Sequence, residues 1–127
     1  MFSKIGLLCL SALIPFTSYA EKGTFEFSVG TQNHIFDSPC IKSIQYVKRD
    51  ETGSDSLGIH LTDRCGDRLG EITHENMGRE LTISYLGNEL STAMIVQRLK
   101  SNFRISTKDT PRPVLMRVID DYNVSLE

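Results

Sequence analysis

The three histidines are the side chains of this sequence that most readily serve as metal ligands or general bases. The segment His74–Gly78 (HENMG) begins like the HExxH motif of zinc proteases, but Gly78 stands where that motif needs its second histidine. His34 and His60 are isolated, and Ser91 has no histidine nearby in the sequence to activate it as a nucleophile. The sequence therefore predicts no catalytic, metal or cofactor site, and we expect the protein not to be an enzyme.

Residues 1–20 have the three parts of a secretory signal peptide. Lys4 supplies the positive charge, Ile5–Phe16 is an apolar run, and Ser18-Tyr19-Ala20 fits a small-x-small cleavage site. The apolar run is too short to cross a bilayer as a helix. We therefore expect cleavage after Ala20 and a mature chain in the periplasm.

Residues 21–127 are enough for one hydrophobic core and too few for two, so we expect a single domain. The whole chain has 14 basic and 16 acidic residues, a net charge of −2. A weakly acidic chain without a basic stripe is a poor nucleic-acid binder. After the signal peptide no apolar run is long enough to span a membrane.

Cys40 and Cys65 are the two cysteines that remain after cleavage, and we expect them to form a disulfide bond. A lone pair of cysteines in an oxidising compartment is usually joined. Closing a loop of this length stabilises a fold by about 3 kcal/mol in the chain-entropy model. Two free buried thiols or a metal site are the alternatives, although neither cysteine has the C-x-x-C or C-x-x-H spacing of a zinc ligand.

Apolar residues that alternate with polar ones predict strands at 24–30, 41–48, 57–61, 81–85, 90–97 and 103–106. Thr62 is placed to cap a helix that Gly78 ends, and Cys65, Leu69 and Ile72 recur on one face of it. Strands and helices in this order predict the α+β class, with a mainly antiparallel sheet and two helices packed on one face.

The connections between these elements are also predicted by residue type. Thr31–Pro39 is expected to be a loop, Arg49–Ser56 an exposed turn and Gly87-Asn88 a two-residue hairpin turn. Thr110 is expected to cap a second helix with Pro111 in its first turn. Its apolar face comprises Val114, Leu115, Val118, Ile119 and Tyr122.

The stretch 57–95 resembles the head subdomain of the first periplasmic loop of SecD and SecDF, accessory subunits of the protein-export translocase. The matching positions are Leu61, Thr62, Thr73, Asn76, Gly78, Leu81, Ile83, Gly87, Ser91 and Ile95. The sequence departs from the family at Met94, where the family usually has proline, and at Cys65. The resemblance implies a stand-alone head domain, and in that family the head is thought to contact a polypeptide emerging from the membrane.

Three kinds of function are compatible with these features. The first is a non-enzymatic periplasmic module that binds exported polypeptides or a secretion component. The second is an inhibitor or immunity protein that neutralises a toxic enzyme in the periplasm. The third is a binder of a small ligand or a cell-wall fragment, in a pocket that Tyr46, Tyr85 and Tyr122 would line. The alternative role for these tyrosines is packing in the core, and we expect it more than a pocket.

Exposed loops and a free sheet edge are the expected contact surfaces with another protein. One candidate is the acidic loop with Asp50, Glu51 and Asp55, and the other is the hairpin tip. The tip comprises Gly87, Asn88 and Glu89. A sheet with an open edge also allows dimers, so the sequence leaves the oligomeric state open.

Overall fold

The computed structural model describes residues 23–48 and 53–126. The predicted signal peptide, its cleavage site after Ala20, and the loop residues Asp50 and Glu51 lie outside these ranges. The strands are β1 (Phe25–Val29), β2 (Gln32–Phe36), β3 (Ile41–Val47), β4 (Ser56–Leu61), β5 (Glu80–Tyr85), β6 (Asn88–Met94), β7 (Asn102–Ser106) and β8 (Ser125–Leu126). The helices are the short 3-10 helix η1 (Ser38–Cys40) and the α-helices α2 (Asp63–His74) and α3 (Arg112–Asp121).

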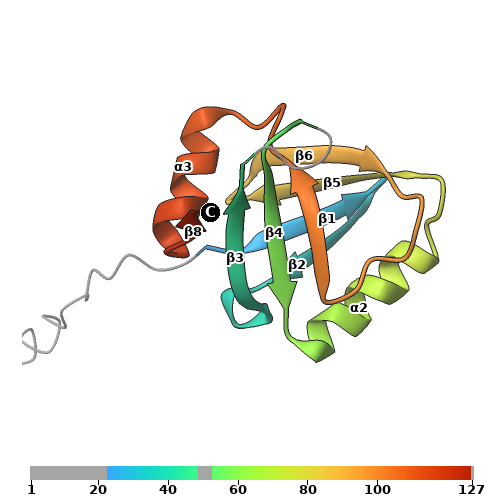
Figure 1. Cartoon of the computed structure of the whole chain (residues 1–127). Helices are drawn as coiled ribbons and strands as arrows, with labels where there is room; N and C mark the ends of the chain where they lie inside the picture. The colour runs from blue at the N-terminus through green and yellow to red at the C-terminus, as the bar shows by residue number, and fades with distance from the viewer. Residues whose placement is uncertain (1–22, 49–52, 127) are drawn as a thin grey trace, which may run out of the picture.

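The described strands form two four-stranded sheets, with strand orders β2-β1-β5-β6 and β7-β4-β3-β8. Every pairing is antiparallel except the short parallel pair of β3 with β8. The predicted α+β class, the mainly antiparallel pairing and the two α-helices are confirmed. The strands are divided between two sheets, however, and α2 and α3 lie at opposite ends of the pair of sheets (Figure 1).

The core lies between the two sheets, because each contributes one alternating row of apolar side chains. Phe25, Phe27 and Val29 of β1 are fully buried, as the alternation in the sequence predicts. The rings of Phe27 and Phe103 are 6.1 Å apart and connect the first sheet to the second. Burial of each large side chain contributes about 1.5–3 kcal/mol.

Helix α2 begins as predicted and joins the core through one face. Thr62 is its N-cap, and the Thr62 Oγ1 accepts a hydrogen bond from the Cys65 N–H. Leu69 and Ile72 are buried. The helix ends at His74, earlier than the predicted end at Gly78, because a turn at 75–78 follows it. Gly78 has the predicted positive φ, of 83°, in that turn. Neither described α-helix is long and apolar enough to cross a membrane.

The sequence analysis did not predict strand β2, and this is its largest error in secondary structure. Residues 31–39 were expected to form a loop, but Gln32–Phe36 pairs with β1 after a tight turn at Gly30, whose φ is 60°. This strand forms the edge of its sheet, and its residues apart from His34 and Phe36 are exposed. An edge strand with one solvated side needs few apolar residues, so alternation did not reveal it.

The hairpin turn between β5 and β6 is displaced by one residue from its prediction. Tyr85 pairs with Asn88, so the turn residues are Leu86 and Gly87, with φ of 50° and 81°. Positive φ at both positions is the geometry of a type I′ turn, and Leu86 adopts it despite its side chain. Residue type therefore indicated the hairpin but not its register.

Helix α3 buries Val118 as predicted, but a different residue is its N-cap. Pro111 is at the N-cap, and the Thr110 hydroxyl donates a hydrogen bond to the Leu90 carbonyl at 2.6 Å instead of capping the helix.

The predicted exposed turn at 49–56 does not extend to Ser56, because Ser56 is buried as the first residue of β4.

Candidate functional site

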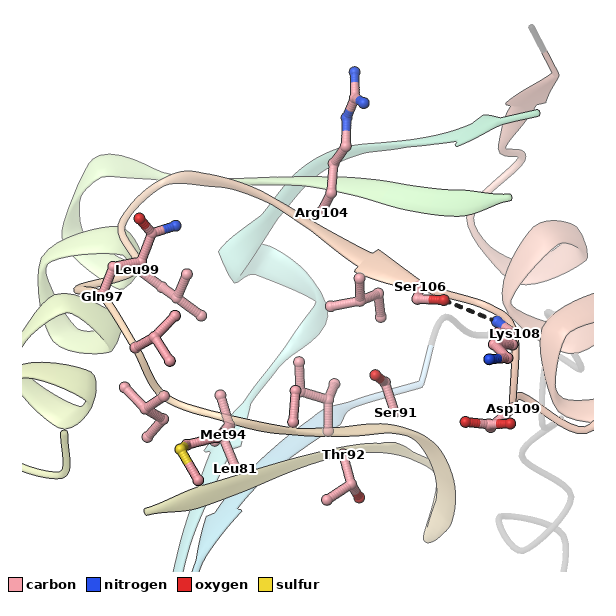
Figure 2. Close-up of a pocket in the computed structure, with 15 residues that line it drawn as sticks. Leu81, Ser91, Thr92, Met94, Gln97, Leu99, Arg104, Ser106, Lys108 and Asp109 are labelled. Atoms are coloured by element: carbon pink, nitrogen blue, oxygen red, sulfur yellow. Dashed lines mark hydrogen bonds between the residues drawn. The ribbon is translucent and has the colours of Figure 1, made fainter. Parts of the chain in front are cut away.

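A groove lies between the free edges of the two sheets, bordered by β6 on one side and β7 on the other (Figure 2). The cavity in it has a volume of about 270 Å³. We call it the β6–β7 groove. Its lining residues are Leu81, Ile83, residues 91–97, Leu99, residues 104–106, Lys108 and Asp109.

The floor of the β6–β7 groove is apolar. Leu81, Ile83, Ile95 and Ile105 line it and are each less than 10% exposed, because they are also part of the core. Met94 and Val96 beside them are 59% and 77% exposed. A groove with an apolar floor and exposed apolar side chains at its rim favours the binding of apolar groups.

The register of β7 leaves the N–H and C=O groups of every second residue on the free edge of the strand. The Thr107 N–H donates to the Asp55 carbonyl at 3.1 Å, and the Leu61 N–H donates to the Ser101 carbonyl at 2.7 Å. Bonded and non-bonded pairs alternate along an antiparallel ladder, so the odd-numbered residues of β7 bond to β4. The N–H and C=O groups of the even-numbered residues point away from β4, and no described strand pairs with them. These residues are Asn102, Arg104 and Ser106.

The side chains of β7 divide into two faces. Phe103 is half-buried and Ile105 is buried, whereas Asn102, Arg104 and Ser106 are exposed. In Figure 2 the Arg104 side chain extends away from the floor of the groove. A chain laid along this edge would therefore have one apolar side and one side next to a positive charge.

Basic side chains gather on the strand and loop that border the groove. Arg98, Lys100, Arg104 and Lys108 are exposed, and none of them forms an ion pair with a described residue. Of these four, Arg104 and Lys108 line the groove together with the acidic Asp109. The sequence analysis did not identify these residues, because other residues separate each of them from the next and they form no run of basic residues.

The predicted hairpin contact residues lie outside the β6–β7 groove. Gly87, Asn88 and Glu89 are exposed at the start of β6. The Asn88 amide donates to the Leu86 carbonyl, and the Glu89 carboxylate accepts a hydrogen bond from the Thr92 hydroxyl at 2.7 Å. Their role in binding a partner remains a prediction.

Of the three predicted contact residues in the acidic loop, Asp55 is the one that the structure describes, and it has structural partners. It is half-buried, and its carboxylate accepts a hydrogen bond from the Tyr46 hydroxyl. Its backbone carbonyl accepts from the Thr107 hydroxyl at 3.2 Å. The hydrogen bond to Asp55 is the main cause of the raised pKa of Tyr46. A change at Asp55 would therefore affect the fold as well as any contact with a partner.

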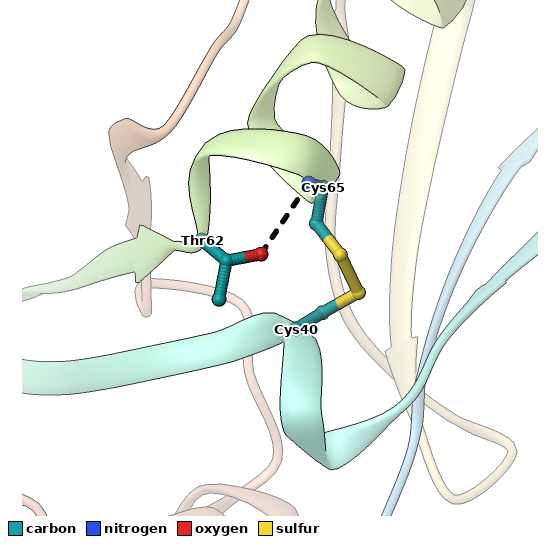
Figure 3. The surroundings of a disulfide bond; sticks show 3 residues. All are labelled: Cys40, Thr62 and Cys65. Atoms are coloured by element: carbon teal, nitrogen blue, oxygen red, sulfur yellow. Dashed lines mark hydrogen bonds between the residues drawn. A yellow bond between two sulfur atoms is a disulfide. The ribbon is translucent and has the colours of Figure 1, made fainter.

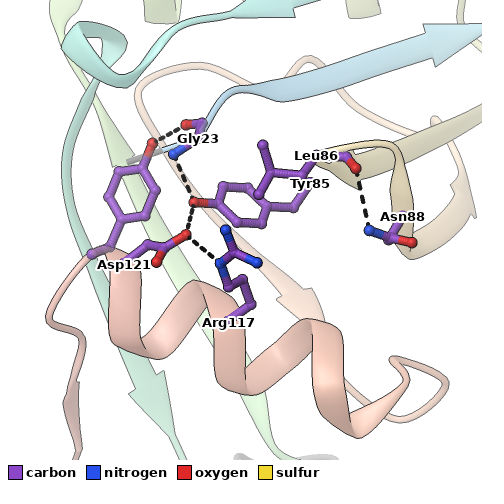
Figure 4. A network of polar contacts seen from close by, with 7 residues as sticks. Gly23, Tyr85, Leu86, Asn88, Arg117 and Asp121 are labelled. Atoms are coloured by element: carbon purple, nitrogen blue, oxygen red, sulfur yellow. Dashed lines mark hydrogen bonds and ion pairs between the residues drawn. The ribbon is translucent and has the colours of Figure 1, made fainter. Parts of the chain in front are cut away.

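Tyr85 and Tyr122 hold the first described residue in place (Figure 4). The Tyr85 hydroxyl accepts from the Gly23 N–H at 2.8 Å and donates to the Asp121 carboxylate at 2.6 Å. The Tyr122 hydroxyl donates to the Gly23 carbonyl at 2.7 Å, and Arg117 pairs with Asp121 at 3.0 Å. Burial raises the pKa of Tyr85 well above its ordinary value and that of Tyr122 to about 12. Both hydroxyls thus tie the start of β1 to α3.

Of the three tyrosines predicted to line a ligand pocket, Tyr85 alone lines one of the two cavities described here. This second cavity has a volume of about 350 Å³ and lies between the β5–β6 hairpin and α3. It is lined by Tyr85, Leu86, Asn88, Pro113, Val114 and Arg117. Binding of a small ligand there remains a prediction.

The structure joins Cys40 and Cys65 in a disulfide bond, with their Cα atoms 5.6 Å apart (Figure 3). The Thr62 N–H also donates to the Cys40 carbonyl at 2.9 Å. Covalent and hydrogen bonds therefore fix the segment before β3 to the first turn of α2.

The three histidines lie on three different elements, β2, β4 and α2. His60 is hydrogen-bonded to the Asn102 side chain at 2.6 Å, and His34 to the Gln32 side chain at 3.3 Å. His74 is exposed at the end of α2. Residues 23–48 and 53–126 contain no group of three His, Cys, Asp or Glu residues that could hold a metal ion.

Comparisons with known proteins agree with this architecture. No protein-family model matches the chain. The protein translocase subunit SecD of Sebaldella termitidis is 32% identical over 74 residues, which are 56% of this chain and 18% of that protein. A solved structure of SecDF, described as a membrane component that enhances protein export, matches with a TM-score of 0.62 at 13% identity. That match covers 84% of this chain and 64% of the SecDF chain. By sequence and structure together, this chain is a distant relative of the periplasmic domain of SecD and SecDF.

Proposed function

We propose that this chain is a non-enzymatic, polypeptide-binding domain that acts in the periplasm as an accessory to protein secretion or export. Residues 21–127 would be the exported domain, released from residues 1–20 by cleavage after Ala20. The relationship to SecD and SecDF links the chain to protein export. The chain spans less than a fifth of the SecD sequence that it matches, so binding of polypeptides is a proposal about this domain alone.

The observation that carries the proposal is the β6–β7 groove. It combines an apolar floor with a strand edge whose backbone groups pair with no described strand. A polypeptide that has not yet folded exposes both apolar side chains and unpaired backbone groups. The groove therefore offers contacts for the apolar side chains and hydrogen-bond partners for the backbone of an unfolded chain. A folded protein with a polar surface needs neither.

The disulfide bond supports a location outside the cytoplasm. Such bonds persist in oxidising compartments, including the bacterial periplasm. The Cys40–Cys65 bond agrees with the extracytoplasmic location that the relationship to a periplasmic domain suggests.

The groove gives less support to an inhibitor of a toxic enzyme. An inhibitor that covers the basic substrate cleft of an enzyme would need an acidic face. Arg104 and Lys108 give this groove a basic rim instead.

A binding assay with one protein in two folding states tests the proposal. The full chain, tagged at its C-terminus and purified after processing in its host, would be titrated into fluorescent α-lactalbumin. One sample would be permanently unfolded by reduction and carboxymethylation, and the matched control would be native. We expect affinity for the unfolded form to exceed that for the native form by at least about tenfold. Equal affinity for the two forms, or no binding to either, would contradict the proposal. A pull-down of the tagged chain from the periplasm is a second test, and recovery of one exported enzyme in stoichiometric amount would also contradict the proposal.

A further inference from the structure

We infer that the free edge of β7 binds an extended polypeptide segment as an added strand and selects segments in which apolar residues alternate with carboxylates. This inference rests on the proposed function and names its site and substrate class. Three independent features of the β6–β7 groove support it: the backbone of β7, its two side-chain faces and the charge around it.

The backbone of β7 sets the geometry of binding. The N–H and C=O groups of Asn102, Arg104 and Ser106 point away from β4 and are spaced two residues apart. An extended chain alongside them can satisfy its own N–H and C=O groups with the same period. β7 has five residues, so a segment of about five to seven residues matches its length.

The side chains of β7 set the pattern that the segment must have. Neighbouring strands place their side chains on the same two faces of a sheet, and directly opposite pairs contact each other. Side chains on the inner face of an added strand would lie beside Phe103 and Ile105, next to the apolar floor of the groove. Side chains on the outer face would lie beside Arg104, which is exposed. Alternating apolar and polar residues therefore fit this edge.

The charge of the border sets the sign of the polar residues. Arg104 and Lys108 line the groove with two positive charges, and Asp109 lines it with one negative charge. Arg98 and Lys100 add two positive charges in the loop before β7. None of the four basic side chains is neutralised by an ion pair with a described residue. Opposite charges on facing strands stabilise the pair and like charges destabilise it, so glutamate and aspartate fit the outer positions and lysine does not.

The other long edge strands offer less to such a segment. On β6 the Leu90 carbonyl already accepts a hydrogen bond from Thr110, and the strand carries Glu89 and no basic residue. β2 lines neither of the two cavities described above. β7 therefore combines an open ladder, an apolar neighbour and uncompensated charge.

Three fluorescent heptapeptides test the predicted pattern against the full processed chain. The first alternates valine with glutamate, the second alternates valine with lysine, and the third has the composition of the first with its glutamates grouped at one end. We expect the first peptide to bind at least about tenfold more tightly than the other two. Equal binding of all three would overturn the inference.

Two pairs of variants test the site. Ser106→Pro removes an N–H that faces the free edge, where proline is tolerated in a sheet, and Ser106→Ala is its matched control. We expect Ser106→Pro to lower affinity for the alternating valine–glutamate peptide at least about tenfold and Ser106→Ala to leave it within about twofold. Arg104→Glu should reverse the preference in favour of the valine–lysine peptide, whereas Arg104→Gln should only reduce the preference for glutamate. Circular dichroism would establish that each variant is folded.

The outcomes separate this inference from the proposed function. If unfolded α-lactalbumin binds with the same affinity to the parent chain, Ser106→Pro and Arg104→Glu, the chain binds polypeptides elsewhere and only the inference is overturned. If unfolded α-lactalbumin does not bind at all, both fail. If sedimentation shows a dimer of this chain that Ser106→Pro dissociates, the edge is occupied by a second copy and the inference is also overturned. Should Ser106→Pro fail to fold, the reversal of charge preference by Arg104→Glu decides the question.

Discussion

The hydroxyl of Thr73 accepts a hydrogen bond of 2.9 Å from the backbone N–H of Leu99. Thr73 is fully buried in α2, and Leu99 lines the groove from the loop between β6 and β7. The same hydroxyl donates to the Leu69 carbonyl at 2.9 Å, within the helix. One side chain thus anchors the loop at the end of the β6–β7 groove to the helix beside it.

Replacing Thr73 with valine keeps the shape of the side chain and removes its hydroxyl. The Leu99 N–H would lose its partner, and leaving a partly buried donor unsatisfied costs about 1–3 kcal/mol. We expect Thr73→Val to lower the free energy of unfolding by that amount, measured by urea denaturation. Thr73→Ser, which keeps the hydroxyl, is the control. A serine variant less stable than the valine variant would show that packing of the methyl group matters more than the hydrogen bond.

Two glycines of α2 provide a matched test of how closely the same loop packs. A Cβ at Gly66 would lie 2.2 Å from the Ser101 Oγ and 2.8 Å from its Cα, whereas a Cβ at Gly70 would meet the Leu99 carbonyl oxygen at 3.4 Å. We expect Gly66→Ala to destabilise the protein by about 1–3 kcal/mol through overpacking. Gly70→Ala should lie between neutral and about 1 kcal/mol more stable, because alanine favours the helix. Thermal denaturation of both variants would check this, and equal melting temperatures would contradict it.

The parts of the fold that the sequence predicted are those in which residue pattern and burial coincide. Phe25 and Phe27 alternate in the sequence and lie in the core, and Thr62 has the residue type and position of a helix cap. The errors arose where contacts distant in sequence decide the structure. β2 is polar and is held as a strand by its pairing with β1. Thr110 is bonded to Leu90, twenty positions earlier in the chain, instead of to its own helix.

The candidate site was less predictable than the fold. A free sheet edge was expected, but which strand provides it depends on the strand order of the two sheets, and sequence pattern does not give that order. Arg98, Lys100, Arg104 and Lys108 show no motif in the sequence. The pairing of β7 with β4 and the turn after β7 bring Arg104 and Lys108 to the groove.

The disulfide bond should account for a large share of the stability. It links residues 25 positions apart. In the chain-entropy model, a disulfide that closes a loop of this length raises the free energy of unfolding by about 3 kcal/mol. We expect a reducing agent to lower the free energy of unfolding of the parent chain by about that amount. The variant with both Cys40→Ser and Cys65→Ser should already be less stable and should not respond to the agent. Two alkylated cysteines in the unreduced exported chain would show that the bond does not form.

Stability should fall in alkaline solution because of the buried tyrosine hydroxyls. The pKa of Tyr122 is raised from 10.0 to about 12, and that of Tyr85 is raised further, by burial and by Asp121. Between pH 10 and pH 12 the unfolded chain loses tyrosine protons that the folded chain retains, so the free energy of unfolding decreases as pH rises. Below about pH 9 this contribution should be fully present.

Urea denaturation at several pH values between 8 and 11.5 would check this prediction. Tyr122→Phe loses the hydrogen bond to Gly23 and is therefore less stable at every pH. The informative quantity is the slope of the free energy of unfolding against pH, and not its value at one pH. We expect a shallower alkaline decrease in this variant than in the parent chain. Equal slopes would show that Tyr122 does not contribute to the pH dependence.

Amide hydrogen exchange tests the central claim most directly, because it reports which backbone groups a bound polypeptide covers. The full processed chain would be measured by NMR with and without saturating unfolded α-lactalbumin, with native α-lactalbumin as the control. We predict slower exchange at the N–H groups of Arg104 and Ser106, on the free edge of β7, in the presence of the unfolded protein alone. Protection confined to the β5–β6 hairpin or to α3, with the exchange at β7 unchanged, would contradict the account.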